Sequence, residues 1–236
     1  MLGFKEVFQN RHAILPVVHV QTPEQALANA EIAKEEGCDG VFLISMEQRA
    51  THQELLEVHR TVREGFGTWF LGINYLDLPS VRVFENLDSG VSGVWTDNAH
   101  IEEWLDEQIE AEEIKRAREV SKWNGLYFGG VAFKYQRYVN AGDLALSAVL
   151  ATKYMDVVTT SGIGTGKAAN PEKISIMKAA IGDHPLGIAS GVSPDNVSQY
   201  IGHADAFLVA SSLLIPNTEN FDKSRVRDLV AAVRGN

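Results

Sequence analysis

The stretch from Met155 to Ser212 constrains the fold of this chain more than any other. It contains three short apolar runs, MDVVTT, LGIAS and AFLVAS, which end in small residues and are separated by two helix-like segments. Such alternation is typical of β/α units. Successive β/α units require parallel strands, because only a crossover helix returns the chain to the same edge of the sheet. The small residues leave room for a ligand at the carboxyl ends of these strands.

The rest of the chain continues this alternation. Five earlier apolar runs predict strands over Ala13–Val20, Gly40–Ser45, Trp69–Asn74, Val91–Thr96 and Leu126–Phe133. Helical patterns lie between them and after the last strand, among them Pro79–Asn86, Ile101–Lys122, Ala141–Lys153 and Asn217–Val233. Eight strands in 236 residues fit an undecorated α/β fold of the TIM barrel, (β/α)8, type. A doubly wound sheet would place a glycine fingerprint after its first strand, where this chain has QTPEQ. We therefore predict a single barrel domain over residues 1–236.

The composition excludes several classes of partner. The formal net charge of -10 argues against nucleic acid, which needs a basic face, and against an anionic membrane surface. No apolar run approaches the roughly 20 residues of a membrane span, and charged residues interrupt the N-terminal stretch where a signal peptide would be apolar. The single cysteine, Cys38, permits no intrachain disulfide and reads as a small core residue. We expect a cytoplasmic protein that can still bind a small anion at a local site. Its tryptophans could form a subunit interface, so a homo-oligomer is possible.

Barrel enzymes carry their chemistry at the carboxyl ends of the strands. The polar residues at these predicted ends include His19, Glu47, Asn74, Asp97, Lys134, Ser190, Ser211 and Ser212. Part of this polarity is expected without any function, because every one of these positions borders solvent in a barrel.

The loops after the seventh and eighth strands predict a phosphate site. Ser190, Gly191 and Val192 begin one loop, and Ser211 and Ser212 end the run LVASS. Barrels often bind phosphate at these two loops, where backbone N–H groups and a helix start supply donors. Ser193-Pro194-Asp195 resembles a helix N-cap with proline in the first turn. The alternative is that these are ordinary tight β/α turns.

The loop after the sixth strand, SGIGTGKAANPEKI, predicts a lid. Gly162, Gly164 and Gly166 surround Thr165, and glycine-rich segments rearrange at little cost. A Walker nucleotide site is unsupported, because Gly166-Lys167 is followed by alanine rather than serine or threonine. Asn74 and Glu47 are further candidates for contact with a substrate.

Lys134, Asp97 and His19 are the candidate catalytic residues. A lysine at a barrel mouth can act as a base, form a Schiff base or bind an anion, and it can also simply reach solvent. Asp97 could be a general base, the partner of Lys134 or part of an Asx turn. His19 is either catalytic or a satisfied core histidine. No spacing of His, Cys, Asp or Glu is specific for a metal site, and Glu47 with Asp97 is the best candidate pair of metal ligands. The sequence identifies no cofactor.

The second half of the chain resembles the BtpA family of TIM-barrel proteins, which includes a photosystem I biogenesis protein. The resemblance covers about residues 90 to 234 and rests on four motifs, Gly130–Tyr135, Thr160–Gly166, Ala189–Asn196 and Ala204–Leu214. It implies the barrel fold. The chain departs from the family pattern in three ways: a glycine replaces the acid of the fifth strand, Tyr135 replaces a histidine and Leu214 replaces a lysine.

Two functions follow as expectations. The first is an enzyme that carries out acid–base, lyase, isomerase or transferase chemistry on a small phosphorylated, sugar-phosphate-like metabolite, with Lys134 and Asp97 at the reacting end. The second is a non-catalytic assembly or regulatory factor that keeps the ligand pocket, and the altered motif of the fifth strand favours it.

Overall fold

Eight parallel strands close into a barrel in the computed structural model, which describes residues 3–235. The strands are β1 (Ala13–His19), β2 (Gly40–Ile44), β3 (Phe70–Asn74), β4 (Gly93–Thr96), β5 (Leu126–Gly130), β6 (Val157–Thr160), β7 (Leu186–Ala189) and β8 (Ala206–Val209). Each strand pairs with the next in the chain, and β8 closes the ring against β1 with Ala13 opposite Ala206. The predicted (β/α)8 fold is confirmed.

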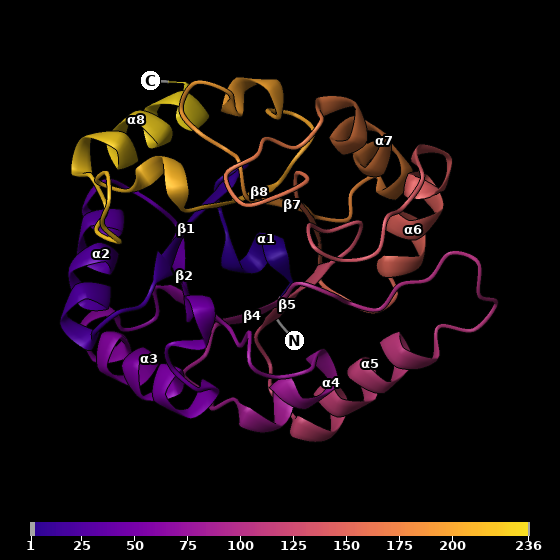
Figure 1. The fold of residues 1–236 in the computed structure, drawn as a ribbon, viewed down its shortest axis with the longest axis horizontal. Coiled ribbons are helices and arrows are strands. Elements are labelled where there is room, and N and C mark those ends of the chain that lie inside the picture. The colour runs from indigo at the N-terminus through magenta and orange to yellow at the C-terminus, as the bar shows by residue number, and fades with distance from the viewer. Residues whose placement is uncertain (1–2, 236) are drawn as a thin grey trace.

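Helices α2 to α8 surround the barrel and α1 lies at its end, as Figure 1 shows. The α-helices are α1 (Phe4–Val7), α2 (Pro23–Glu35), α3 (His52–Phe66), α4 (Ser80–Val83), α5 (Ile109–Ser121), α6 (Leu144–Ala151), α7 (Pro171–Ile181) and α8 (Lys223–Arg234). Short 3-10 helices are η1 (Met46–Gln48), η2 (Phe84–Asn86), η3 (Ala141–Asp143), η4 (Val197–Gln199) and η5 (Ser211–Leu213). In residues 3–235, no helix is both long and apolar enough to cross a membrane.

Some predicted boundaries were wrong because tertiary contacts override local pattern. The helix predicted from Ile101 begins only at Ile109. The side chain of Gln108 hydrogen-bonds the backbone N–H and carbonyl of Glu102, and Arg137 donates to the carbonyl of Ile101. These bonds hold residues 101–108 as a loop.

The fifth strand and the last helix are also shorter than predicted. β5 ends at Gly130 rather than Phe133, since Ala132 has φ of 48°, a left-handed value incompatible with a strand. The last helix starts at Lys223 rather than at Asn217. Asp222 caps this start by accepting hydrogen bonds from two backbone N–H groups.

The helix predicted after Ser193 does not form. Between β7 and β8 the chain makes only the 3-10 turn η4, which begins at Val197. The amide oxygen of Asn196 accepts a hydrogen bond from the N–H of Ser193, and its amide nitrogen donates to the carbonyl of Gly191. The side chain of Asn196 thus closes a tight turn in place of a helical start.

Aromatic rings fill the interior of the barrel. The Phe42 ring contacts the rings of Phe70, Trp95 and Phe128, with centroids 5.1 to 6.1 Å apart. Gly72 and Gly93 make room for them, because a Cβ at either position would come within 2.4 Å of a phenylalanine ring. The strands are therefore closed around a solid core, and a ligand can reach only the ends of the barrel.

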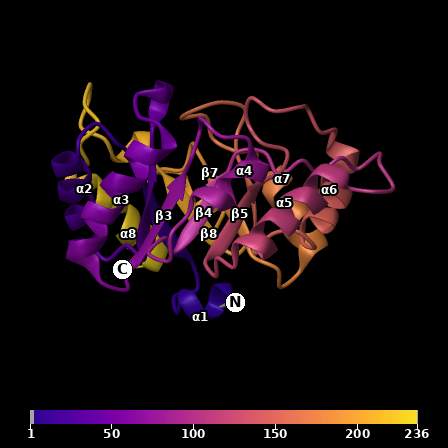
Figure 2. The ribbon, with the colours of Figure 1, turned by 90° about the horizontal axis from the view of Figure 1, so that it is seen from below.

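The short helix α1 closes the amino-terminal end of the barrel, a feature that the sequence analysis missed. Phe4 and Phe8 are buried, their rings lie 4.9 Å apart, and Phe8 contacts Phe70 at the same distance. Figure 2 shows α1 below the strands, at the end opposite the long loops. The remaining open end is the one formed by the carboxyl ends of the strands.

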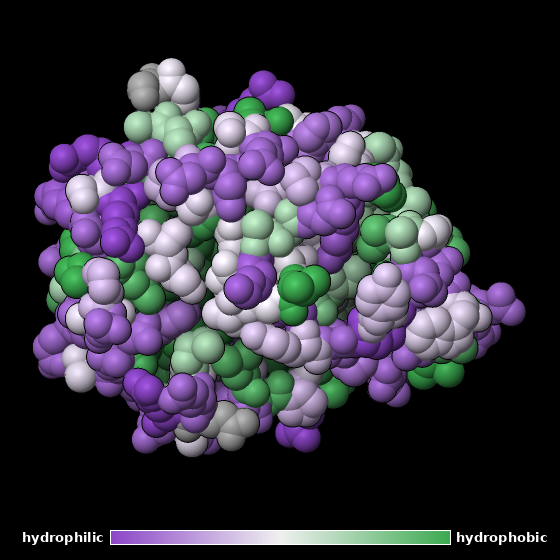
Figure 3. Space-filling model, turned by 45° about the horizontal axis from the view of Figure 1, so that its top comes forward, coloured by the Kyte–Doolittle hydropathy of each residue, from purple (hydrophilic) through white to green (hydrophobic). Residues whose placement is uncertain are grey.

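The tryptophans divide between core and surface. Trp95 and Trp123 are buried, whereas Trp104 is 60% exposed and lies under the guanidinium of Arg137, 4.4 Å from its ring. On the face shown in Figure 3, hydrophilic side chains predominate and apolar ones form separate small groups. A subunit interface at Trp104 stays a prediction.

We predict that Phe8→Ala lowers the free energy of unfolding by about 3 kcal/mol, because it leaves a void between α1 and Phe70. Urea unfolding measures the loss. The control is Val120→Ala, at a position that is 74% exposed, which should change stability by less than about 0.5 kcal/mol. A loss for Phe8→Ala as small as the control's would show that α1 does not stabilise the barrel.

Candidate active site

Polar residues from five strand ends meet in one cavity at the carboxyl-terminal mouth of the barrel. Its lining includes the polar residues His19, Lys134, Thr165, Ser190 and Ser211, together with Trp95, Val17, Ile44, Met46, Leu208 and Ala210. The cavity volume is about 40 Å³. Pockets for small-molecule ligands usually measure about 300 to 1,000 Å³, so the mouth is closed in this structure.

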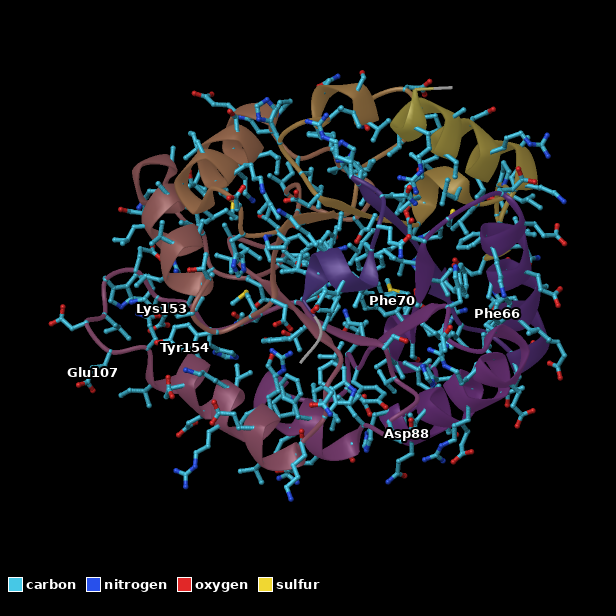
Figure 4. All side chains as sticks on the ribbon, turned by 180° about the vertical axis from the view of Figure 1, so that it is seen from behind. Phe66, Phe70, Asp88, Glu107, Lys153 and Tyr154 are labelled. Atoms are coloured by element: carbon cyan, nitrogen blue, oxygen red, sulfur yellow. The ribbon has the colours of Figure 1, made fainter. Side chains whose placement is uncertain are left out.

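Two larger grooves lie at the opposite end, beside α1. Figure 4 looks onto this end and shows Phe70 and Asp88, which line one groove of about 660 Å³, and Lys153 and Tyr154, which line another of about 620 Å³. Residues at the amino-terminal end of a barrel serve stability, whereas chemistry takes place at the carboxyl end. The small cavity is therefore the candidate active site.

The predicted lid lies across this mouth. Ser190 fastens it, because the Ser190 hydroxyl accepts a hydrogen bond from the N–H of Gly166 at 3.0 Å and donates to the carbonyl of Gly164 at 3.1 Å. Gly162 and Gly191 allow the close approach, since a Cβ at either position would lie 2.1 Å from the carbonyl oxygen of Lys167. The segment fits over the loop after β7 only because these residues lack side chains.

Thr165 connects the lid to the loop after β5. Its backbone N–H donates to the Tyr135 hydroxyl at 3.0 Å, and its own hydroxyl accepts from Lys134 Nζ at 3.4 Å. Ser190 and the pair Lys134 and Tyr135 thus hold the segment from two sides of the barrel. These are a few exposed hydrogen bonds, which local opening breaks at small cost.

Asp97, Asn74 and Lys134 form a polar group on neighbouring strand ends. Asn74 is buried at the end of β3 and donates to Asp97 Oδ1 at 3.1 Å. Burial raises the pKa of Asp97, although the Asn74 bond and the charge of Lys134 oppose the rise. Burial likewise lowers the pKa of Lys134, against the charge of Asp97. Both shifts move the groups toward neutral pH, where proton transfer is most effective.

His19 ends β1 and faces the same cavity, with its Nδ1 2.8 Å from Glu219 Oε2. Glu47, in contrast, is exposed and paired with Arg49 at 2.8 Å. It lines a separate cavity of about 120 Å³ with His19 and Glu219. The structure therefore places Glu47 at the rim rather than beside Asp97. In residues 3–235, no three His, Cys, Asp or Glu side chains gather so as to hold a metal ion.

The two predicted phosphate loops lie in contact. The Ser212 hydroxyl donates to the carbonyl of Val192 at 2.8 Å, and Ser190 and Ser211 both face the mouth. Ser190 and Gly191 have φ of 93° and 73°, so this turn has left-handed geometry at two successive residues. Such conformations are uncommon for serine and cluster at functional sites.

Trp95 contributes a buried donor without an acceptor. It is 4% exposed and lines the cavity, and its indole Nε1 has no hydrogen-bond partner within the described part of the chain. Buried polar groups are normally paired. An oxygen atom of a ligand or a water would satisfy this donor.

With the fold and site described, we compared the chain with known proteins. Residues 92–235, more than half of the chain, match the model of the BtpA family. The chain belongs to the BtpA family. The match begins just before β4, so the family model covers β4 to β8 and the loops of Lys134, Ser190 and Ser211.

Other relatives of this BtpA-family chain are more distant. It is 24% identical to a geranylgeranylglyceryl phosphate synthase of Methanococcoides burtonii over 98 residues, which are 40% of this chain and 39% of that protein. The chain thus matches about two fifths of that synthase's length.

Two solved structures show the same fold. One is (S)-3-O-geranylgeranylglyceryl phosphate synthase from Thermoplasma acidophilum in complex with its substrate sn-glycerol-1-phosphate, at a TM-score of 0.70 and 11% identity over all of both chains. The other is phosphoribosyl anthranilate isomerase from Thermus thermophilus, at a TM-score of 0.62 and 14% identity over 94% of this chain and 98% of that one.

Two glycines at the end of β5 leave no room for a side chain on this backbone. A Cβ at Gly130 would lie 2.1 Å from the carbonyl oxygen of Asp97, and one at Gly129 would lie 2.9 Å from Ala99. The Tyr135 hydroxyl, in the loop after β5, accepts a hydrogen bond from the lid. The end of β5 is therefore in close contact with the loop after β4.

Lys173 is a residue that the sequence analysis overlooked. From the first turn of α7, its Nζ donates to the carbonyls of Ala132 at 2.5 Å and Ser161 at 2.9 Å, which fixes the loops after β5 and β6. Burial lowers its pKa to about 8. A cation in the first turn of a helix opposes the helix dipole, and this misplaced charge was the available signal.

We predict a pH-dependent stability from Lys173. Its pKa is about 8 in the folded chain and near 10.5 in the unfolded chain, so the unfolded state binds more protons between these values. The stability of the wild type relative to Lys173→Met therefore rises with pH through this window, by about 2 kcal/mol between roughly pH 7.5 and 9.5. Urea unfolding of both proteins at the two pH values measures it. A constant difference would show that the ammonium is not destabilised by burial.

Proposed function

We propose that this protein is an enzyme that acts on a small phosphorylated metabolite at the carboxyl-terminal mouth of its barrel. One observation carries the proposal: Lys134, Ser190 and Ser211, which follow β5, β7 and β8, line one cavity. Phosphate sites of barrels usually lie at the loops after the last two strands. The phosphorylated substrate of the structurally similar synthase supports the same substrate class.

The lid must open for such a ligand to enter, because the closed cavity is too small for it. The phosphate then rests on the backbone N–H groups of Gly191, Val192, Ser211 and Ser212. Opening also frees Lys134 and Ser190 from Thr165 and Gly166, to which they are hydrogen-bonded in the closed form. The ligand's oxygens replace these partners, so closure of Gly162, Gly164 and Gly166 over the ligand completes the site.

The reaction that fits these groups is proton transfer or the making and breaking of a C–C or C–N bond. Phosphate binding fixes the substrate, so that Lys134 and Asp97 meet its reacting end in a constant orientation. Their pKa values are shifted toward neutrality by burial. A lyase, isomerase or transferase acting on a sugar-phosphate-like compound would use such a pair.

We predict that Lys134→Ala weakens the binding of sn-glycerol 1-phosphate at least roughly tenfold, because it removes a charge-assisted hydrogen bond. Isothermal calorimetry with this compound and with inorganic phosphate measures the change. Lys153→Ala is the control, since Figure 4 shows Lys153 at the opposite end of the barrel. Equal affinities for wild type and Lys134→Ala would remove the role given to Lys134.

The altered fifth strand favours a second function, that of an assembly or regulatory factor that keeps the pocket. A thermal-shift screen of phosphorylated metabolites distinguishes the two. A ligand at about 100 times its dissociation constant stabilises a protein by about 2.7 kcal/mol, which such a screen detects. The absence of any stabilising compound, together with a co-purifying partner protein, would favour the second function.

A further inference from the structure

His19 and Glu219 form a histidine–carboxylate pair at the edge of the mouth. His19 Nδ1 lies 2.8 Å from Glu219 Oε2, and the two side chains are 13% and 28% exposed. His19 lines both the cavity that contains Lys134 and the neighbouring cavity that contains Glu47. Its other ring nitrogen, Nε2, makes no hydrogen bond within residues 3–235 that would compete with a ligand.

Helix α2 fixes the backbone that carries the carboxylate. Gln25 and Asn29 each donate a side-chain hydrogen bond to the backbone carbonyl of Glu219, at 2.7 and 2.8 Å. Asn29, which is 1% exposed, also accepts from the N–H of Phe221, and Gln25 donates to the carbonyl of His19. Figures 1 and 2 both show the loop before α8, in yellow, beside α2. The backbones of both partners are therefore fixed by one helix.

The pairing determines where the histidine carries its proton. An ionised carboxylate only accepts hydrogen bonds, so Nδ1 must be the protonated nitrogen. The neutral ring then presents the lone pair of Nε2, and Glu219 stabilises the imidazolium that forms when Nε2 takes up a proton. This is the arrangement by which a carboxylate orients a catalytic histidine.

We propose that His19 is a general base of the mouth cavity, acting through Nε2, and that Glu219 is its positioning residue. The proposal rests on the proposed function and narrows the substrate to one that yields a proton from a hydroxyl group or from a carbon next to a carbonyl. Nε2 takes the proton, and the electron pair stays on the substrate, with the charge on its oxygen. The imidazolium returns the proton in the second half of the reaction, so no oxidant or reductant is needed.

Two other groups fit this step. Trp95 lines the same cavity, and its indole N–H, which has no partner among residues 3–235, would donate to the oxygen on which charge develops. Lys134 lies at the end of β5, and β1 and β5 are opposite one another in a ring of eight strands. A substrate between them would meet His19 on one side and an ammonium group on the other.

The first test measures the tautomer of His19. In ¹⁵N-labelled protein at a pH where the ring is neutral, long-range ¹H–¹⁵N spectra should show the Nδ1–H form in the wild type and a mainly Nε2–H form in Glu219→Ala. Asp77→Ala is the matched control, because Asp77 lies 2.8 Å from His52 Nδ1 in a pair that lines neither cavity. An Nε2–H ring in the wild type, or no change in Glu219→Ala, would overturn the proposal.

The second test separates this proposal from the proposed function. The affinity of Glu219→Ala for inorganic phosphate should be within about twofold of that of the wild type, since Glu219 does not line the cavity that contains Ser190 and Ser211. With the compound that the metabolite screen identifies as substrate, Glu219→Ala should lower kcat at least about tenfold. His19→Ala should lower kcat by roughly 10²- to 10⁴-fold. Absence of phosphate binding by the wild type would defeat the proposed function, on which this proposal rests. Normal binding with an unchanged kcat in Glu219→Ala would defeat this proposal alone.

Discussion

The packing of aromatic rings inside the barrel is the constraint on which the rest of the structure depends. Four aromatic rings occupy the space that the strands enclose: Phe42, Phe70, Trp95 and Phe128. Only glycine at positions 72 and 93 leaves room for them. Dense packing of this kind leaves no interior volume for a ligand. Since α1 covers one end, the functional groups had to gather at the other, above Trp95.

The same packing sets the electrostatics of the mouth. Asp97, Lys134 and Lys173 stand at the upper edge of the apolar core, and burial is the largest cause of the pKa shift of each. Lys173 is the extreme case, because its Nζ donates to two backbone carbonyls and pairs with no carboxylate in the described part of the chain. Its neutral amine keeps both hydrogen bonds, so the fold tolerates a cation site that is largely unprotonated at alkaline pH. The apolar packing of the surrounding core offsets the free energy that burial of these groups costs.

The sequence predicted those features that local pattern encodes. The apolar runs predicted the eight strands, which the structure confirms. Of the residues that follow the strands, Lys134, His19, Ser190 and Ser211 line one cavity, whereas Asp97 and Asn74 are not part of its lining. It could not predict contacts between distant residues. Glu219 lies 200 residues from His19, and Gln108 reshapes the start of α5 through bonds that no periodicity reveals. Lys173 escaped notice because its partners are backbone carbonyls, which have no sequence signature.

The packing at the end of β5 limits which strands can supply a proton acceptor. On this backbone a side chain at Gly130 has no space beside Asp97, and the Tyr135 hydroxyl is hydrogen-bonded to the lid. A proton acceptor for the mouth cavity can come from another strand, and His19 of β1 faces that cavity. His19 hydrogen-bonds Glu219. Glu219 lies within the region that matches the family model, residues 92–235, and His19 lies outside it. Proton transfer through this pair would join the first strand to the last loop, with Lys134 facing the same cavity from the loop after β5.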